Sequence, residues 1–152
     1  MEENELYLFI SEPPKGKANR YIRQKGGGVF KPWRISSWET KAAWEIKLQL
    51  ENIGFKEPFS CEISIEAVIF LKDKRRRDID NMLKTLWDVL EKTGVIKNDN
   101  LIYEINTIKH VDKNLEGIFL KIKPYEEKLL KIEEAKNFIL KADKNIIEKG
   151  RG

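Results

Sequence analysis

The fold follows most directly from residues 61–94, "CEISIEAVIFLKDKRRRDIDNMLKTLWDVLEKTG", because the hydrophobic period changes within them. Apolar and polar residues alternate over 61–71, which predicts a β-strand with one buried face. After a charged turn, apolar residues recur at helical spacing from Met82 to Leu90, and Gly94 follows as a stop signal. The sequence therefore predicts a strand that leads through a cationic turn into a helix.

The flanking segments predict three further strands and two further helices. The strands alternate in the same way, and we expect the last two to pair as a hairpin: 5–11, 101–111 and 115–123. Ser36 and Glu39 are spaced as a capping box for a helix that Gly54 ends. The second helix covers 125–149. We therefore predict an α+β fold, a mixed sheet of about four to five strands with helices packed on it.

The long C-terminal helix has an amphipathic pattern. Its apolar stripe consists of Leu129, Ile132, Ala135, Ile139, Ala142 and Ile146. We expect this stripe to pack on the chain's own domain, with self-association as the alternative. Residues 1–124 are then the main domain, and residues 125–152 are a helical extension of it.

The composition limits the kinds of site that the chain can build. Of its 152 residues 36% are charged, against about a quarter in ordinary domains, and the net charge of +4 favours an acidic partner. Cys61 and His110 are the only residues of their types, which excludes an internal disulfide and argues against a zinc site or a serine–histidine–aspartate triad. A bound metal would need oxygen ligands, which favours Mg²⁺ or Mn²⁺.

The same composition bears on location. No apolar run is long enough to span a membrane, and the polar start "MEENEL" is not a signal peptide. A single cysteine also fits a reducing compartment. We therefore expect a cytoplasmic protein without a membrane partner.

Acidic residues gather where the strand at 61–71 gives way to the next helix. Asp78 and Asp80 are two residues apart, so their side chains can point to the same side of an extended segment. We expect Asp99 to join them, because the strand that follows it can pair beside 61–71. Three clustered carboxylates repel one another and are tolerated mainly when a divalent cation neutralises them. The spacing alone also fits acids that merely cap a helix.

Two neighbours of the acids add to the candidate site. Lys84 follows Asp80 by four residues on the same helical face, where its ammonium group can stabilise a phosphate in the transition state. We expect Asn81, beside Asp80, to hydrogen-bond a carboxylate or a metal-bound water.

Two basic segments are candidates for contact with a phosphate backbone. One is the turn before the acids, and the other is a glycine-containing loop within 15–34, where Trp33 is also a candidate for stacking on a base. The DNA-binding candidates are Arg20, Arg23, Lys25, Lys74, Arg75, Arg76 and Arg77. The other interpretation of such cation runs is a solvated surface turn.

Residues 75–102, "RRRDIDNMLKTLWDVLEKTGVIKNDNLI", closely resemble the core of the RusA family of Holliday junction resolvases. The family pattern has a basic run, Asp-hydrophobic-Asp-Asn, a lysine three residues after the Asn, a helix, a glycine and an Asp in the next loop. The segment "PPKGKANRYIR" at 13–23 is similar to the family's opening segment. The resemblance covers residues 6–123. The family often has two adjacent acids in the loop, whereas Asn98 precedes Asp99 here.

The resemblance implies a small dimeric endonuclease, dependent on Mg²⁺ or Mn²⁺, that nicks four-way DNA junctions in recombination and repair. Asp78, Asp80 and Asp99 would bind the metal, Lys84 would stabilise charge at the phosphate, and the cations would hold the DNA backbone. A four-way junction has two-fold symmetry, which suits a homodimer with two sites. Two alternatives remain open, a nuclease for flaps and forks in general and a non-catalytic DNA-binding module.

Overall fold

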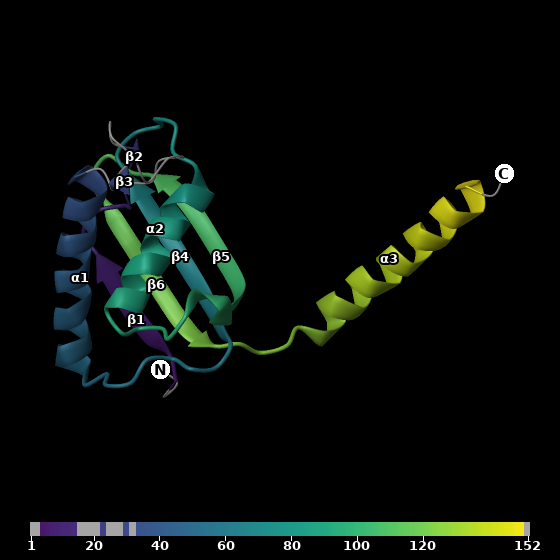
Figure 1. Cartoon of the computed structure of the whole chain (residues 1–152), viewed down its shortest axis with the longest axis horizontal. Helices are drawn as coiled ribbons and strands as arrows, with labels where there is room; N and C mark the ends of the chain where they lie inside the picture. Colours follow the sequence, from purple (N-terminus) through teal and green to yellow (C-terminus); the bar gives the residue numbers. More distant parts are fainter. Residues whose placement is uncertain (1–3, 15–21, 24–28, 31–32, 151–152) are drawn as a thin grey trace.

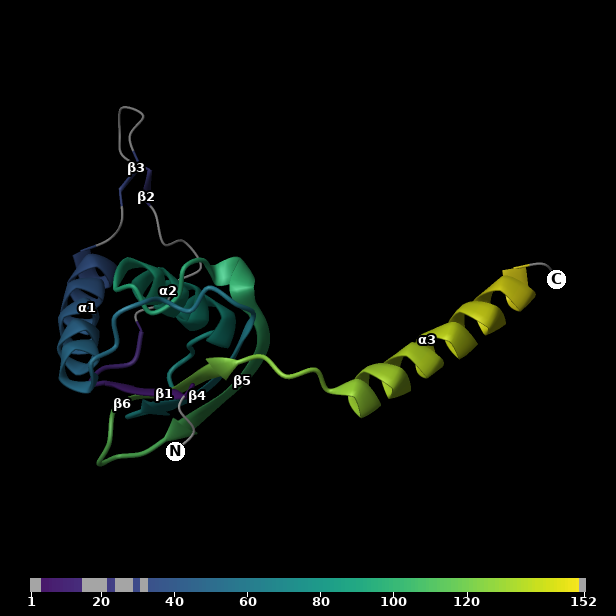
Figure 2. The same cartoon turned by 90° about the horizontal axis from the view of Figure 1, so that it is seen from below.

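The computed structural model describes residues 4–14, 22–23, 29–30 and 33–150. Its main body is a four-stranded sheet that carries two helices on one face (Figures 1 and 2). The strands lie in the spatial order β1 (Leu6–Ile10), β6 (Gly117–Pro124), β4 (Ile63–Leu71) and β5 (Ile102–Val111). The predicted α+β class with a mixed sheet is confirmed. A separate two-stranded ribbon pairs β2 (Ile22–Arg23) with β3 (Val29–Phe30).

The strand predicted from residues 61–71 is central to the sheet. β4 pairs in parallel with β5, from Ile63 beside Ile102 to Leu71 beside Val111, and antiparallel with β6. The predicted hairpin between the last two strands is therefore wrong, because β4 lies between them. The loop between β5 and β6 crosses the end of β4, where the amide of Asp112 donates to the carbonyl of Leu71 at 2.8 Å.

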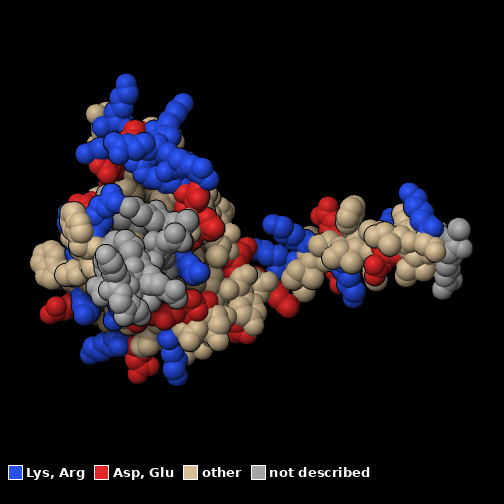
Figure 3. Space-filling model, turned by 45° about the horizontal axis from the view of Figure 1, so that its top comes forward, with Lys and Arg blue, Asp and Glu red and all other residues tan. Residues whose placement is uncertain are grey.

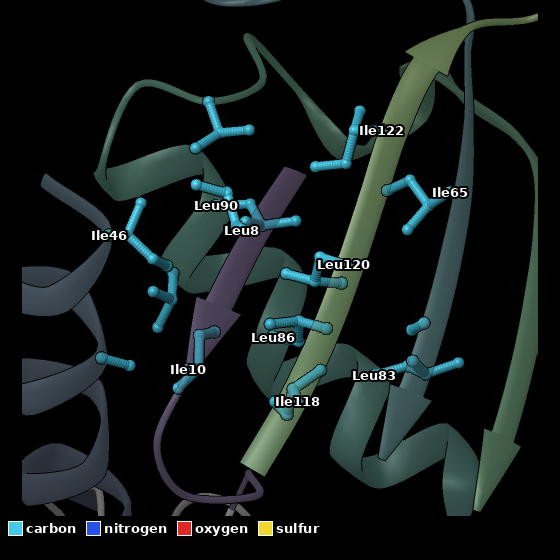
Figure 4. Packing of buried hydrophobic residues seen from close by; sticks show 14 of the residues in the cluster. Leu8, Ile10, Ile46, Ile65, Leu83, Leu86, Leu90, Ile118, Leu120 and Ile122 are labelled. Atoms are coloured by element: carbon cyan, nitrogen blue, oxygen red, sulfur yellow. The ribbon is translucent and has the colours of Figure 1, made fainter. Parts of the chain in front are cut away.

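The core lies between the sheet and helices α1 (Trp33–Ile53) and α2 (Ile79–Lys92). Every second residue of β4 is buried, as its alternating sequence requires, and Ile46 of α1 and Leu86 of α2 are fully buried among them (Figure 4). Each such aliphatic side chain stabilises the fold by about 1.5–3 kcal/mol. This packing fixes the end of β4 and the start of α2.

The helix boundaries confirm one sequence signal and correct another. Gly94 has φ +78°, and behind it the amide of Val95 donates to the carbonyl of Leu90 at 3.0 Å, as expected of a glycine that ends a helix. The capping box at Ser36 is wrong, since α1 already begins at Trp33. Glu39 is instead buried within that helix and pairs with Lys92 of α2, with 3.2 Å between Oε2 and Nζ.

Helix α3 (Leu129–Gly150) projects away from the sheet (Figures 1 and 2). Residues 126–141 are all exposed, and within the apolar stripe only Ala142 is partly buried. The prediction that this stripe packs on the chain's own domain is wrong, because α1 and α2 already cover the face of the sheet that holds the core. None of the helices that the structure describes is both long and apolar enough to cross a membrane.

Candidate active site

The predicted acid pair lies where the cationic turn enters α2. The turn follows the buried end of β4 at Leu71, and Asp78 occupies the position before the first helical residue, with extended backbone (φ −81°, ψ 128°). Asp80 is in the first turn of the helix, and both acidic side chains belong to exposed residues. Ile79, between them, packs against the core, so the two acids are held at the surface.

The side chain of Asp78 does not act as a helix cap. It makes no capping hydrogen bond to the amides of α2, although its backbone carbonyl accepts the first helical bond, from Met82. The Nε atom of Arg76 lies 3.7 Å from Asp78 Oδ1. The partial positive charge of the helix N-terminus favours anions at this point. This carboxylate is therefore exposed, oriented by weak contacts and available to a cationic ligand.

The cationic turn is organised by Asp73, which sequence reasoning missed. The Asp73 carboxylate accepts a hydrogen bond from the amide of Arg75 at 2.9 Å and pairs with Arg77 Nη1 at 2.9 Å. These bonds, first that of the Arg75 amide, lower the pKa of Asp73. The signal was available, because aspartate side chains commonly accept a bond from the backbone amide two residues later.

The ordered turn presents its cations to solvent. Lys74, Arg75 and Arg76 are exposed, whereas Arg77 is partly buried and its carbonyl accepts a 2.7 Å bond from Lys109 Nζ of β5. Figure 3 shows lysine and arginine side chains gathered at this end of the domain. Three exposed cations thus stand directly beside the acid pair.

Lys84 lies on the exposed side of α2, one turn after Asp80, as its spacing predicted. Asn81 is partly buried, and its carbonyl accepts a bond from the hydroxyl group of Thr85 at 3.2 Å. Lys84 and the acid pair therefore lie at the same end of α2.

Asp99 lies at the opposite end of α2. It begins the short helix η1 (Asp99–Leu101), and its amide donates to Glu91 Oε1 at 2.8 Å. An α-helix rises about 1.5 Å per residue, so about 16 Å of helix axis separates Asp80 from Glu91. The prediction that Asp99 joins Asp78 and Asp80 within one chain is wrong.

The error came from the direction of pairing. β5 does pair beside β4, as predicted, but two parallel strands start at the same edge of a sheet. Asp99 precedes β5 and so lies near the start of β4, whereas Asp78 follows its end. In the part of the chain that the structure describes, no three histidine, cysteine or acidic side chains lie together as a metal site would require.

The second basic segment can be placed only in part. Arg20 and Lys25 lie outside the described residues, and Arg23 is described only as a backbone position in β2. Arg23 pairs with Val29 in the antiparallel ribbon of β2 and β3, which lies toward the same end of the domain as the cationic turn (Figure 1). Trp33, at the start of α1, is 76% exposed. This exposure suits a side chain that stacks on a base better than one that belongs to the core.

The structure thus brings an exposed carboxylate pair and a lysine together beside a cationic turn. The family model described as "Endodeoxyribonuclease RusA" matches residues 12–123, and the chain belongs to this family. It is 52% identical to the crossover junction endodeoxyribonuclease RusA of Aquifex aeolicus (strain VF5), over 83% of this chain and 95% of that protein. It is 29% identical to RusA of Escherichia coli (strain K12) and 27% identical to that of Enterobacteria phage 82, in each case over 70% of this chain and 83% of the relative.

Proposed function

We propose that this protein is a structure-selective endonuclease that nicks four-way DNA junctions in recombination and repair. Its relatives are crossover junction endodeoxyribonucleases, and the match covers most of the chain. One observation carries the proposal. The carboxylate of Asp78 makes no capping hydrogen bond to α2 and is exposed beside Arg75 and Arg76. The nuclease domain comprises residues 1–124, and residues 125–152 are an extension of it. Cys61 is exposed, and a free thiol at the surface fits a reducing cytoplasm.

The acid pair suits Mg²⁺, with Mn²⁺ as the alternative. Mg²⁺ is commonly held by one or two carboxylates together with phosphate oxygens of the substrate, and Asp78 and Asp80 provide two such carboxylates at one place. When bound, the ion supplies positive charge to the scissile phosphate and lowers the pKa of a coordinated water. Lys84 stabilises negative charge that develops on the phosphate, and the cationic turn holds the flanking backbone.

We further propose that the active unit is a homodimer and that Asp99 acts in the site of the other copy. The proposal is supported by the roughly 16 Å of helix that separates the two ends within one chain, which keeps a chain's own Asp99 away from its acid pair. A two-fold dimer would then carry two equivalent composite sites, which matches the two nicks that a four-way junction needs.

The activity is tested with a synthetic four-way junction, a three-way junction and a linear duplex of the same sequence. We expect cleavage of the four-way junction only with Mg²⁺ or Mn²⁺, in paired nicks. Equal cleavage of three-way junctions would instead favour a general branched-DNA nuclease. Junction binding without cleavage in either metal would favour a non-catalytic binding module.

The composite site is tested by mixing two inactive chains. In a mixed dimer of Asp80→Asn with Asp99→Asn, one site carries both substitutions and the other carries neither, so nicking should return in the mixture. If all three acids acted within one chain, each site would carry one substitution and the mixture would stay inactive. A mixture of Asp78→Asn with Asp80→Asn is the matched control, since both residues belong to the same half of a site.

A further inference from the structure

Helix α3 lies beyond the family match, which ends at residue 123, and it repeats with a period of seven. Isoleucine recurs at Ile132, Ile139 and Ile146, and alanine follows three residues after the first two of them, at Ala135 and Ala142. This alternating three–four spacing is that of the two core positions of a coiled coil. The three isoleucines are 43%, 60% and 68% exposed, so the seam has no partner within the described chain.

We propose that α3 pairs with α3 of a second copy of this chain as an antiparallel two-stranded coiled coil. The sizes of the core residues favour this direction. In a parallel pair each core layer joins equal residues, so wide isoleucine layers would alternate with narrow alanine layers. In an antiparallel pair each alanine faces an isoleucine, so these layers have a uniform volume that allows dense packing.

Charge selects one register. With Ile139 opposite Ala142 of the second copy, the flanking residue Lys136 lies opposite Asp143, and the pair occurs twice by symmetry. A shift by one heptad would bring the two copies of Lys136 together. A parallel pair would bring Lys131 toward Lys136 of the second copy, which is repulsive. The charge pattern and the sizes of the core residues therefore agree on one arrangement.

The other partners for an exposed amphipathic helix fit less well. α3 carries five lysines and four acidic residues within Leu129–Gly150, so it lacks the strong positive charge of a helix that binds anionic lipid or DNA. Most of the stability of a helix in a protein comes from packing of its apolar face, which favours a partner that covers the seam of α3.

The arrangement is tested by cysteine cross-linking in the full-length chain with Cys61→Ser. One preparation carries Ile139→Cys and a differently sized, tagged preparation carries Ala142→Cys. After mixing and mild oxidation, we expect the mixed disulfide to exceed either single-variant disulfide several-fold. Leu140→Cys in place of Ile139→Cys is the control, because Leu140 lies one residue off the seam and is 57% exposed. Predominant single-variant disulfides would indicate a parallel pair, and no cross-link would mean no pairing; either result overturns the proposal.

The register is tested by charge exchange in the same cross-linking chains. Lys136→Glu in both should lower the yield several-fold, because two acids then face each other, and Lys136→Glu with Asp143→Lys should restore it. Lys136 and Asp143 are seven residues apart on one helix and do not pair within it. Failure of the double exchange to restore the yield overturns the register. Cross-linking that appears only with anionic vesicles or DNA present assigns α3 to those ligands and overturns the pairing.

Discussion

The two ends of α2 carry acids in opposite settings. At the first end, Asp78 and Asp80 are exposed, without a side-chain cap, beside a cationic turn. At the other end, Asp99 is also exposed, but its amide is held by Glu91 and no second candidate acid follows it in η1. The first end thus holds two of the three predicted acids, and the other end holds the third. The two ends of α2 differ in their acids and surroundings, and the proposed composite site would join the first end of one copy to the other end of a second copy.

Loss of charge at the first end should have the largest effect. Asp80→Asn keeps the shape of an exposed side chain, so the fold should survive, but cleavage should fall by several orders of magnitude because the metal is no longer bound. Junction binding should persist or tighten, since a negative charge near the phosphates has gone. Cleavage and binding are measured separately. Asp88→Asn, later in α2, is the control that should cleave normally. Parent rates for both Asp80→Asn and Asp99→Asn would show that the acids have no catalytic role.

Removal of cations from the same end should change binding more than chemistry. Arg75→Ala with Arg76→Ala should reduce the slope of log affinity against log salt by about two, because each phosphate contact contributes about one. The slope is measured from junction affinities over a range of salt concentrations. Lys141→Ala with Lys144→Ala, exposed in α3, removes the same charge elsewhere and should leave the slope unchanged. Equal slopes for all three proteins would mean that the cationic turn faces only solvent.

A smaller effect is expected from the other end. Glu91→Ala removes the acceptor of the Asp99 amide, so η1 should move more freely and cleavage should fall several-fold while junction affinity stays the same. Glu91→Gln retains an acceptor oxygen and should cleave near the parent rate. Single-turnover rates at saturating junction separate these outcomes. If Gln were as harmful as Ala, the charge of Glu91 and not its hydrogen bond would be responsible.

The smallest effect concerns pH. Bonds from the Arg75 amide and Arg77 lower the pKa of Asp73 in the folded state below its ordinary value of 3.8. Their stabilisation is therefore present above that value and is lost as the pH falls through the lower folded pKa. Asp73→Asn should lack this dependence, so its denaturation midpoint should decline slightly less than that of the parent between about pH 5 and pH 2. Parallel midpoint curves for the two proteins would contradict this role of Asp73.

Patterns along the chain were a good guide to individual elements and a poor guide to how they meet. The period of β4, the stop at Gly94 and the position of Lys84 depend on local spacing, and the structure agrees with each of them. The hairpin and the acid cluster failed because each depends on which strands pair and in which direction. The alternation of apolar and polar residues in β5 would be the same beside a parallel strand as beside an antiparallel strand, so it does not reveal the direction of pairing.

The failure at α3 had another cause. A stripe of apolar residues predicts that a helix is covered, but it does not identify what covers it. Ala135 and Ala142 were assigned to the helix's own domain although their heptad spacing fits a second helix equally well. The position of α3, clear of the sheet, distinguishes packing on its own domain from packing on a second helix (Figure 2).

The pairing of β1 with β6 has a consequence for synthesis of the chain. The register joins Leu6 to Ile122, so the first strand made lies beside the last strand of the sheet. At about 5–20 residues per second, roughly 6–23 seconds pass between the synthesis of Leu6 and the synthesis of Ile122. During that interval the apolar segment Leu6–Ile10 has no strand to pair with. Folding of the domain must therefore wait for its C-terminal strand, and the early chain depends on protection from aggregation until then.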